Sequence, residues 1–157
     1  MSVIGRRKSK LNYYLDIAEA VLDRSTCLRR KYGAVIVKDD EIISTGYNGA
    51  PRGCTNCDDL GCCPRETQNI PHGERYELCR SVHAEANAII SASRKNMIGA
   101  TIYLAGRQAD DGQRFTNPEP CAMCKRLILN AGIDWVVTRN PNGEITRVRT
   151  NTYFDMI

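Results

Sequence analysis

The sequence predicts an α/β fold, a three-layer α-β-α sandwich around a mixed central sheet of about five strands. Two observations predict it. Segments in which apolar residues recur with helical spacing alternate along the chain with short runs of β-branched residues. The chain has 157 residues, the length of one ordinary domain, so we expect a single domain over residues 1–157.

The first half of the chain predicts a helix followed by a hairpin. Apolar residues between 10 and 24 recur at three- and four-residue steps, which is typical of an amphipathic helix. The runs 33–37 and 41–45 flank Lys38–Asp40 in an apolar, polar, apolar pattern that predicts a β-hairpin. The stretch 49–82 is rich in Gly, Pro, Cys and charge and has no sustained periodicity. We expect a cysteine-rich insertion there, held by something other than a hydrophobic core.

The second half alternates helices and strands. The predicted elements are a helix at 84–93, a strand at 100–104, a helix at 121–130 that ends near Gly132, a strand at 133–138 and an edge strand at 143–149. Both helices would begin beside each other at one end of the sheet, where the functional sites of α/β proteins lie.

Two short motifs carry the chemistry of this chain. His83-Ala84-Glu85 is followed by Pro120-Cys121-Ala122-Met123-Cys124. Catalytic zinc takes three protein ligands and keeps a fourth position for water, and one imidazole with two thiolates meets that need. The combination is the signature of zinc-dependent nucleobase deaminases. The alternative is a pair of buried or redox-active cysteines with an ordinary helix-capping His83.

Spacing supports the same interpretation. Cys121 and Cys124 would both project from the first turn of a helix that Pro120 opens, and a helix N-terminus favours the thiolate form. Glu85 is then the catalytic residue. Its carboxylate can take a proton from the metal-activated water and pass protons to the ring and to the departing ammonia.

Composition narrows the class of protein. The formal net charge is +4 and the isoelectric point is near 8.6, which suits a phosphorylated small molecule without demanding a polynucleotide. No apolar run approaches the ~20 residues of a membrane span, so we expect a cytoplasmic protein with no membrane partner. Eight cysteines in such a chain favour metal sites over disulfides.

The motifs resemble those of the deoxycytidylate (dCMP) deaminases of the zinc-dependent cytidine deaminase superfamily. The resemblance covers residues ~11–138 and rests on the segment 46–53 (GYNGAPRG), the cysteine-rich insertion and the two zinc motifs. It implies a hydrolase of nucleotide metabolism that converts dCMP to dUMP, with zinc-bound hydroxide attacking C4 of cytosine while Glu85 shuttles protons.

The resemblance also implies roles for individual residues. Asn48 would hydrogen-bond the sugar, and the backbone at Ala84 and before Cys121 would hold the base. Arg52 would reach the phosphate, although a solvated loop arginine is an equal alternative.

A regulatory nucleotide would lie near the same turn. Tyr47 and Gly49 would contact it, and Arg94 resembles a position linked to effector response or subunit contacts. Members of this kind are commonly homohexamers that dCTP activates and dTTP inhibits, and the resemblance implies the same for this chain. The alternatives are a tight turn at Tyr47–Gly49 and a helix-end charge at Arg94.

Six cysteines exceed what catalysis uses. Four thiolates make a closed structural zinc site, which can hold a loop that lacks its own core. Some relatives carry such a second zinc, and Cys27 and Cys57 match two of its ligand positions. We predict the set Cys27, Cys57, Cys62 and Cys79, with Cys54, Cys63 and His72 as substitutes. The alternative is a group of partly buried free thiols.

One segment departs from the family pattern. The chain inserts residues 105–119 between the strand at 100–104 and Pro120. We expect Arg107, Arg114 or Phe115 to reshape what the site accepts, unless the segment is a surface excursion.

Three functions from different classes are compatible with a zinc site of this kind. A deaminase of a free nucleotide is favoured over an editing enzyme for single-stranded nucleic acid, because the basic clusters are few and aromatic residues make up 6% of the chain. A non-catalytic zinc-binding or DNA-uptake accessory protein is disfavoured by the presence of Glu85.

Overall fold

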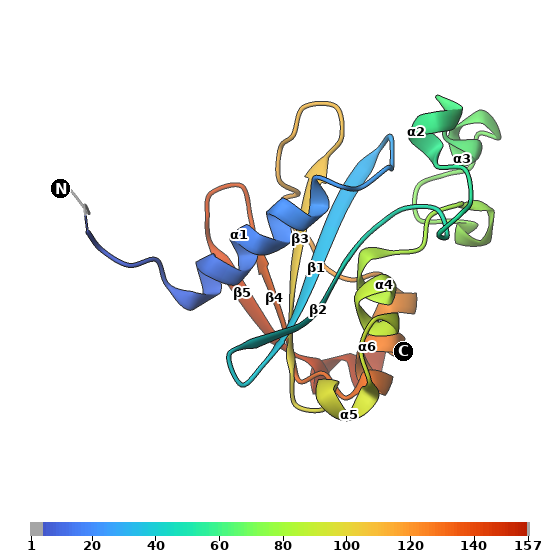
Figure 1. Ribbon diagram of the computed structural model, residues 1–157. Coiled ribbons are helices and arrows are strands. Elements are labelled where there is room, and N and C mark those ends of the chain that lie inside the picture. The colour runs from blue at the N-terminus through green and yellow to red at the C-terminus, as the bar shows by residue number, and fades with distance from the viewer. Residues whose placement is uncertain (1–4, 157) are drawn as a thin grey trace.

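The computed structural model describes residues 5–156 and places five strands between two layers of helices (Figure 1). The helices are α1 (Lys10–Leu22), α2 (Cys57–Leu60), α3 (Pro64–Thr67), α4 (Ala84–Ile90), α5 (Arg94–Met97) and α6 (Ala122–Ala131), with 3-10 helices η1 (Tyr76–Leu78) and η2 (Thr150–Met156). The strands are β1 (Arg30–Lys38), β2 (Glu41–Tyr47), β3 (Thr101–Gln108), β4 (Trp135–Arg139) and β5 (Ile145–Arg149).

The sheet has the order β2-β1-β3-β4-β5. All neighbouring pairs are antiparallel except β3 and β4, which run parallel. A parallel pair needs a crossover connection, and α6 supplies it. The predicted α/β class and mixed five-stranded sheet are confirmed.

Alternation along the strands divides the core between two faces. Val35 and Val37 pack with Leu15 of α1 on one face, whereas Ala34 and Ile36 pack with α4 and α6 on the other. Burying side chains of this size stabilises the fold by roughly 1.5–3 kcal/mol each. In Figure 1, α1 accordingly covers one side of the sheet, and α4, α5 and α6 cover the opposite side.

Two strand glycines let a helix approach each face closely. A Cβ atom on Gly33 would lie 2.2 Å from the Ala18 carbonyl oxygen of α1. A Cβ atom on Gly46 would lie 2.4 Å from both the Ala84 carbonyl oxygen and the Ala88 nitrogen of α4. Each helix therefore rests on strand backbone at these points.

Several predicted boundaries differ from the structure. The helix expected at 84–93 ends at Ile90, and a separate short helix begins at Arg94. Serines between them compete with the helix by bonding to nearby backbone, which makes this junction a weak place for continuous helix. The strand expected at 100–104 continues to Gln108, so the first part of the 105–119 segment is strand.

The insertion at 49–82 contains α2, α3 and η1 and projects beyond the end of the sheet (Figure 1). Between residues 50 and 82 the only buried residues are Cys57 and Arg65. None of the helices in the described residues has the length and apolar character needed to cross a bilayer.

Cation–π contacts connect the outer strand β5 to its neighbour β4. The guanidinium carbons of Arg147 and Arg149 lie 4.4 and 5.1 Å from the ring centroid of Trp135 on β4. Both arginines are exposed.

Candidate active site

The ends of two helices bring the predicted metal ligands together. His83 is the N-cap residue of α4, and Cys121 is the N-cap residue of α6, with Pro120 just before it. Cys124 lies in the first turn of α6 and is buried. The ligand atoms of these three residues all lie within 4.8 Å of one another.

The geometry of the three side chains fits a tetrahedral metal ion. His83 Nδ1 lies 3.5 Å from the Cys121 sulfur and 3.4 Å from the Cys124 sulfur. Zinc bonds of about 2.3 Å to sulfur and about 2.0–2.1 Å to nitrogen would place such atoms roughly 3.6 Å apart in a tetrahedral site. A soft donor set of one imidazole and two thiols suits zinc.

The pKa values of the two ligand thiols shift in opposite directions. The hydrogen bond between the two sulfurs lowers the pKa of Cys121 to about 4, with a further contribution from His83. The same hydrogen bond and burial raise the pKa of Cys124. These opposite shifts describe one proton held between two sulfurs, which a divalent cation would displace on binding.

Glu85 lies beside this group in the first turn of α4 and is 5% exposed. Burial raises the pKa of its carboxyl group, and the neighbouring His83 opposes that rise. A carboxyl group with a raised pKa can both accept and return a proton near neutral pH. The predicted catalytic role of Glu85 is therefore compatible with its position.

His83, Glu85 and Cys121 line a cavity of about 290 Å³. Three arginines, Arg29, Arg30 and Arg65, also line this cavity, and they were not among the residues predicted for the site. Their positive charge suits an anionic group on a ligand whose base reaches Glu85. The insertion has no sequence periodicity that distinguishes Arg65 from other charged residues. Only the structure shows that Arg65 lines the cavity.

Arg65 also reaches the metal ligands through an aromatic ring. Its guanidinium carbon lies 4.8 Å from the centroid of the Tyr76 ring, and this ring meets His83 edge-on at 5.4 Å. Arg65 donates hydrogen bonds to the Pro71 and Glu74 carbonyl oxygens, whereas its buried Nε has no partner among the described residues. The insertion thus packs directly against the imidazole of His83.

Asn48 lines the cavity, where a sugar contact was predicted, but most of the hydrogen bonds of its amide group are made within the protein. Its Oδ1 accepts hydrogen bonds from the Tyr32 N–H at 2.8 Å and the Ser25 hydroxyl at 2.6 Å. Its Nδ2 donates to the Arg30 carbonyl oxygen at 2.8 Å. An amide nitrogen carries two protons, so one remains for a ligand.

Other predicted substrate and effector residues lie elsewhere. Arg52 lines a second cavity of about 490 Å³ together with Tyr47 and Gly49, so it does not reach the catalytic cavity as predicted. Ala84 is fully buried and is absent from the described lining of the catalytic cavity. Arg94 donates from Nε to the Asn130 carbonyl oxygen at 2.9 Å, which connects α5 to the end of α6.

Three of the predicted structural cysteines lie in one region with Cys63, but among the described residues only His83, Cys121 and Cys124 bring three ligand atoms within 4.8 Å of one another. Burial raises the pKa of the Cys57 thiol, and Cys27, Cys63 and Cys79 add to the rise, so these sulfurs lie close to it. Cys62 is exposed and is absent from that group. Cys63, one of the predicted substitutes, lies near Cys57 instead.

The remaining candidates have other surroundings. His72 lines the catalytic cavity, where the charge of Arg30 lowers its pKa. Cys54 is exposed and lines the second cavity. The eight cysteines form no disulfide within the described chain.

A mixed sheet with a His and a Cys-x-x-Cys pair at the starts of two helices, and a buried Glu beside them, defines the class of zinc-binding nucleobase deaminases. The family model for the cytidine and deoxycytidylate deaminase zinc-binding region matches residues 8–139. The chain belongs to this family of deaminases, which are hydrolases.

Individual relatives agree with this assignment. A deoxycytidylate deaminase of Mycobacterium phage D29 is 42% identical over 130 residues, covering 80% of this chain and 90% of the phage protein. A deoxycytidylate deaminase of Schizosaccharomyces pombe is 34% identical over 131 residues, covering 83% of this chain but 37% of the yeast protein. The crystal structure of the cyanophage S-TIM5 dCMP deaminase in complex with dCMP and dUMP has a TM-score of 0.57 and 28% identity, and the match covers 87% of this chain and 89% of that one.

Proposed function

We propose that this protein hydrolyses dCMP to dUMP and ammonia with one zinc ion bound by His83, Cys121 and Cys124. The observation that carries the proposal is the buried Glu85 beside three ligand atoms within 4.8 Å of one another. The dCMP deaminases among the relatives support the choice of substrate.

The residues of the cavity would divide the reaction between them. When bound, zinc would act as a Lewis acid and lower the pKa of water to about 7. Glu85 would take the proton of the attacking water, deliver a proton to N3 of the base, and later protonate the departing amine. Its burial supports this role, because a desolvated carboxylate is a stronger base.

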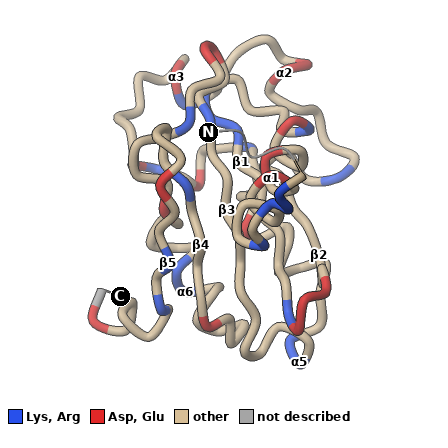
Figure 2. The backbone as a smooth tube through the Cα atoms, turned by 90° about the vertical axis from the view of Figure 1, so that its left-hand side faces the viewer, with Lys and Arg blue, Asp and Glu red and all other residues tan. Residues whose placement is uncertain are grey.

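The charge of the cavity supports a phosphorylated substrate. Arg29, Arg30 and Arg65 line the same cavity as His83 and Cys121. Lys and Arg positions are mixed with Asp and Glu over the molecule instead of forming one continuous basic stripe (Figure 2). This distribution favours a free nucleotide over a nucleic-acid strand. The cytoplasmic location expected from the sequence stays a prediction.

Ammonia release from dCMP, CMP, dCTP, deoxycytidine and a cytosine-containing single strand tests this function. We expect selective turnover of dCMP. Glu85→Gln should keep zinc and lose at least about 10²-fold in kcat, because the proton shuttle is removed. Glu41→Gln on the exposed part of β2 is the matched control and should retain activity. Full activity of Glu85→Gln, or turnover of the strand alone, would refute the proposal.

We further propose a second, structural zinc bound by Cys27, Cys57, Cys63 and Cys79. Cys27, Cys63 and Cys79 line one cavity, and all three raise the pKa of the buried Cys57 thiol, which supports this set. A closed four-thiolate site would stabilise an insertion with little core of its own. Two zinc ions per chain are expected, falling to one in Cys63→Ser but not in the matched variant Cys62→Ser. An unchanged count in Cys63→Ser would exclude this ligand set.

Regulation and assembly are proposed from the second cavity and an apolar surface. Arg24 lies 5.9 Å over the Tyr47 ring at the second cavity, and Arg52 adds positive charge there, which suits the phosphates of dCTP or dTTP.

Met123 and Leu127, one turn apart on α6, are both exposed. We propose that a face containing these side chains joins subunits in a homo-oligomer such as a hexamer. Sedimentation with dCTP, with dTTP and without nucleotide tests both ideas, and a monomer indifferent to either nucleotide would contradict them.

A further inference from the structure

The segment between β3 and α6 contacts both faces of the sheet. After Gln108 the chain turns back, and Arg114 pairs with Arg107 in an isolated antiparallel bridge. The Phe115 N–H donates to the Gly106 carbonyl oxygen at 3.2 Å, which continues the pairing. Because successive residues of an extended strand point to opposite faces, Arg114 and Phe115 project to opposite sides of the sheet.

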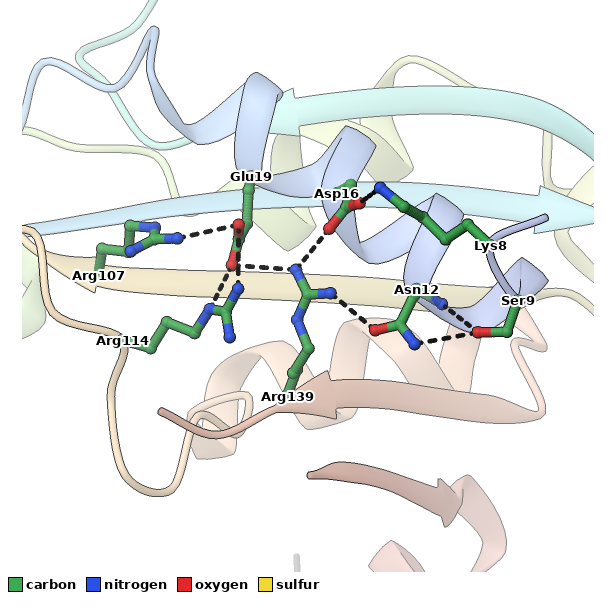
Figure 3. Close-up of polar contacts among 8 residues, drawn as sticks. All are labelled: Lys8, Ser9, Asn12, Asp16, Glu19, Arg107, Arg114 and Arg139. Atoms are coloured by element: carbon green, nitrogen blue, oxygen red, sulfur yellow. Dashed lines mark hydrogen bonds and ion pairs between the residues drawn. The ribbon is translucent and has the colours of Figure 1, made fainter. Parts of the chain in front are cut away.

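On the face covered by α1, ion pairs fix this segment (Figure 3). Glu19 of α1 accepts from Arg107 Nη2 at 2.9 Å and from Arg114 Nε at 2.6 Å. Arg107 Nη1 also donates to the Gly112 carbonyl oxygen at 2.7 Å within the turn. Burial opposes ionisation of Glu19, but the hydrogen bonds from Arg114 and Arg107 outweigh it and lower the pKa of the carboxyl group. We call Glu19, Arg107 and Arg114 the α1 clamp.

On the opposite face, Phe115 lies against two residues of the catalytic cavity. Its ring centroid lies 5.2 Å from that of Tyr32 with the planes tilted by 33°. The guanidinium carbon of Arg30 lies 5.5 Å from the Phe115 centroid. A Cβ atom on Gly106 would lie 2.6 Å from Phe115 and 2.7 Å from Tyr32, so the two rings occupy space that only glycine leaves open.

Among the cavity arginines, Arg30 has the guanidinium best placed to bind an anion. Arg29 pairs with Glu66 at 2.7 Å, and Arg65 donates to two carbonyl oxygens. Arg30 makes no ion pair with a carboxylate in the described part of the chain, and its guanidinium lies over the Phe115 ring and beside the Tyr32 hydroxyl. A guanidinium stacked on a ring keeps its N–H edge available for a phosphate.

We propose that Phe115 is a positioning residue that holds the Arg30 guanidinium toward the phosphate of the substrate, and that the α1 clamp on the other side of the sheet holds Phe115 in place. This inference rests on the proposed function, because it assigns a residue to the phosphate end of the same cavity. It gives the segment 105–119 a role in distinguishing a nucleotide from a nucleoside.

The test compares ligands that differ only in the phosphate. Affinities of the zinc-loaded protein for dUMP and deoxyuridine are measured by calorimetry, beside kcat/KM for dCMP and deoxycytidine. Phe115→Leu should weaken dUMP binding by about fivefold to thirtyfold, the range of one cation–π contact, and leave deoxyuridine unchanged. Phe115→Tyr keeps the aromatic face and should restore wild-type affinity. Glu19→Gln, outside the cavity, should change dUMP affinity in the same direction by a smaller factor.

If Phe115→Leu weakens the binding of dUMP and of deoxyuridine equally, Phe115 has only a structural role and the inference is overturned. Unchanged dUMP affinity in Phe115→Leu would also overturn it. Melting temperatures of each variant show whether the protein is folded at the assay temperature. A wild type that prefers dUMP to deoxyuridine but does not deaminate dCMP would refute the proposed function alone. A wild type without preference for the phosphate would overturn the inference itself.

Discussion

Gly46 offers a sharp test of how the sheet positions the metal ligands. In Gly46→Ala the new methyl group would meet the Ala84 carbonyl oxygen and the Ala88 nitrogen at 2.4 Å, roughly 1 Å short of normal contact. Both atoms are backbone, so α4 must move, and His83 and Glu85 move with it. Overpacking of this kind costs about 1–3 kcal/mol. A displacement near 1 Å at a reacting group costs about 10²-fold in rate.

Gly33→Ala is the matched control. Its methyl group would meet the Ala18 carbonyl oxygen of α1 at 2.2 Å, so a comparable loss of stability is expected. Yet α1 carries no metal ligand. Thermal unfolding and kcat for dCMP deamination are measured for both variants, with zinc per chain. We expect both melting temperatures to fall by roughly 2–12 °C, and only Gly46→Ala to lose turnover at a temperature where it is folded. Equal kinetic losses in the two variants would refute the reasoning.

Three further outcomes are expected. Asn48→Ala should destabilise the fold by about 1–3 kcal/mol, because the Tyr32 N–H and the Ser25 hydroxyl lose their acceptor, and denaturant unfolding at neutral pH measures the loss. Ile128→Ala should cost about 2–5 kcal/mol in the same measurement and leave zinc per folded chain unchanged, since the side chain is fully buried in the core. The pKa of Glu19 is lowered from its ordinary value of 4.5, so its ion pairs stabilise the fold fully at pH values above 4.5. This stabilisation is lost as the pH falls through the folded-state pKa. Unfolding curves from pH 7 to 3 should therefore show a smaller acid-induced loss of stability for Glu19→Gln than for the wild type, and parallel curves would contradict the assignment.

The sequence was sufficient for the layers and for the catalytic ligands. Apolar periodicity is strong in α1 and in the hairpin strands, because each buries one face against a continuous core. His83, Cys121 and Cys124 were predictable because zinc chemistry restricts both residue type and spacing, and the structure brings them together.

The insertion and the cavity wall were not predictable in the same way. Arg52 follows the GYNG turn closely in sequence, yet the fold directs it to the second cavity. Cys62 and Cys63 are adjacent, so their spacings from Cys57 differ by one residue. Only the path of the chain through α2 and α3 leaves Cys62 exposed and places Cys63 near Cys57. Local patterns do not encode contacts that depend on the route of an irregular segment.

The exposed Arg147 and Arg149 over Trp135 bear on how copies of this protein can meet. β5 is the last strand of the sheet, and an uncovered outer strand offers its backbone N–H and C=O groups as a template for cross-chain β-pairing. Two guanidinium groups fixed along this strand would repel the same strand of another copy. The arrangement disfavours edge-to-edge aggregation at β5.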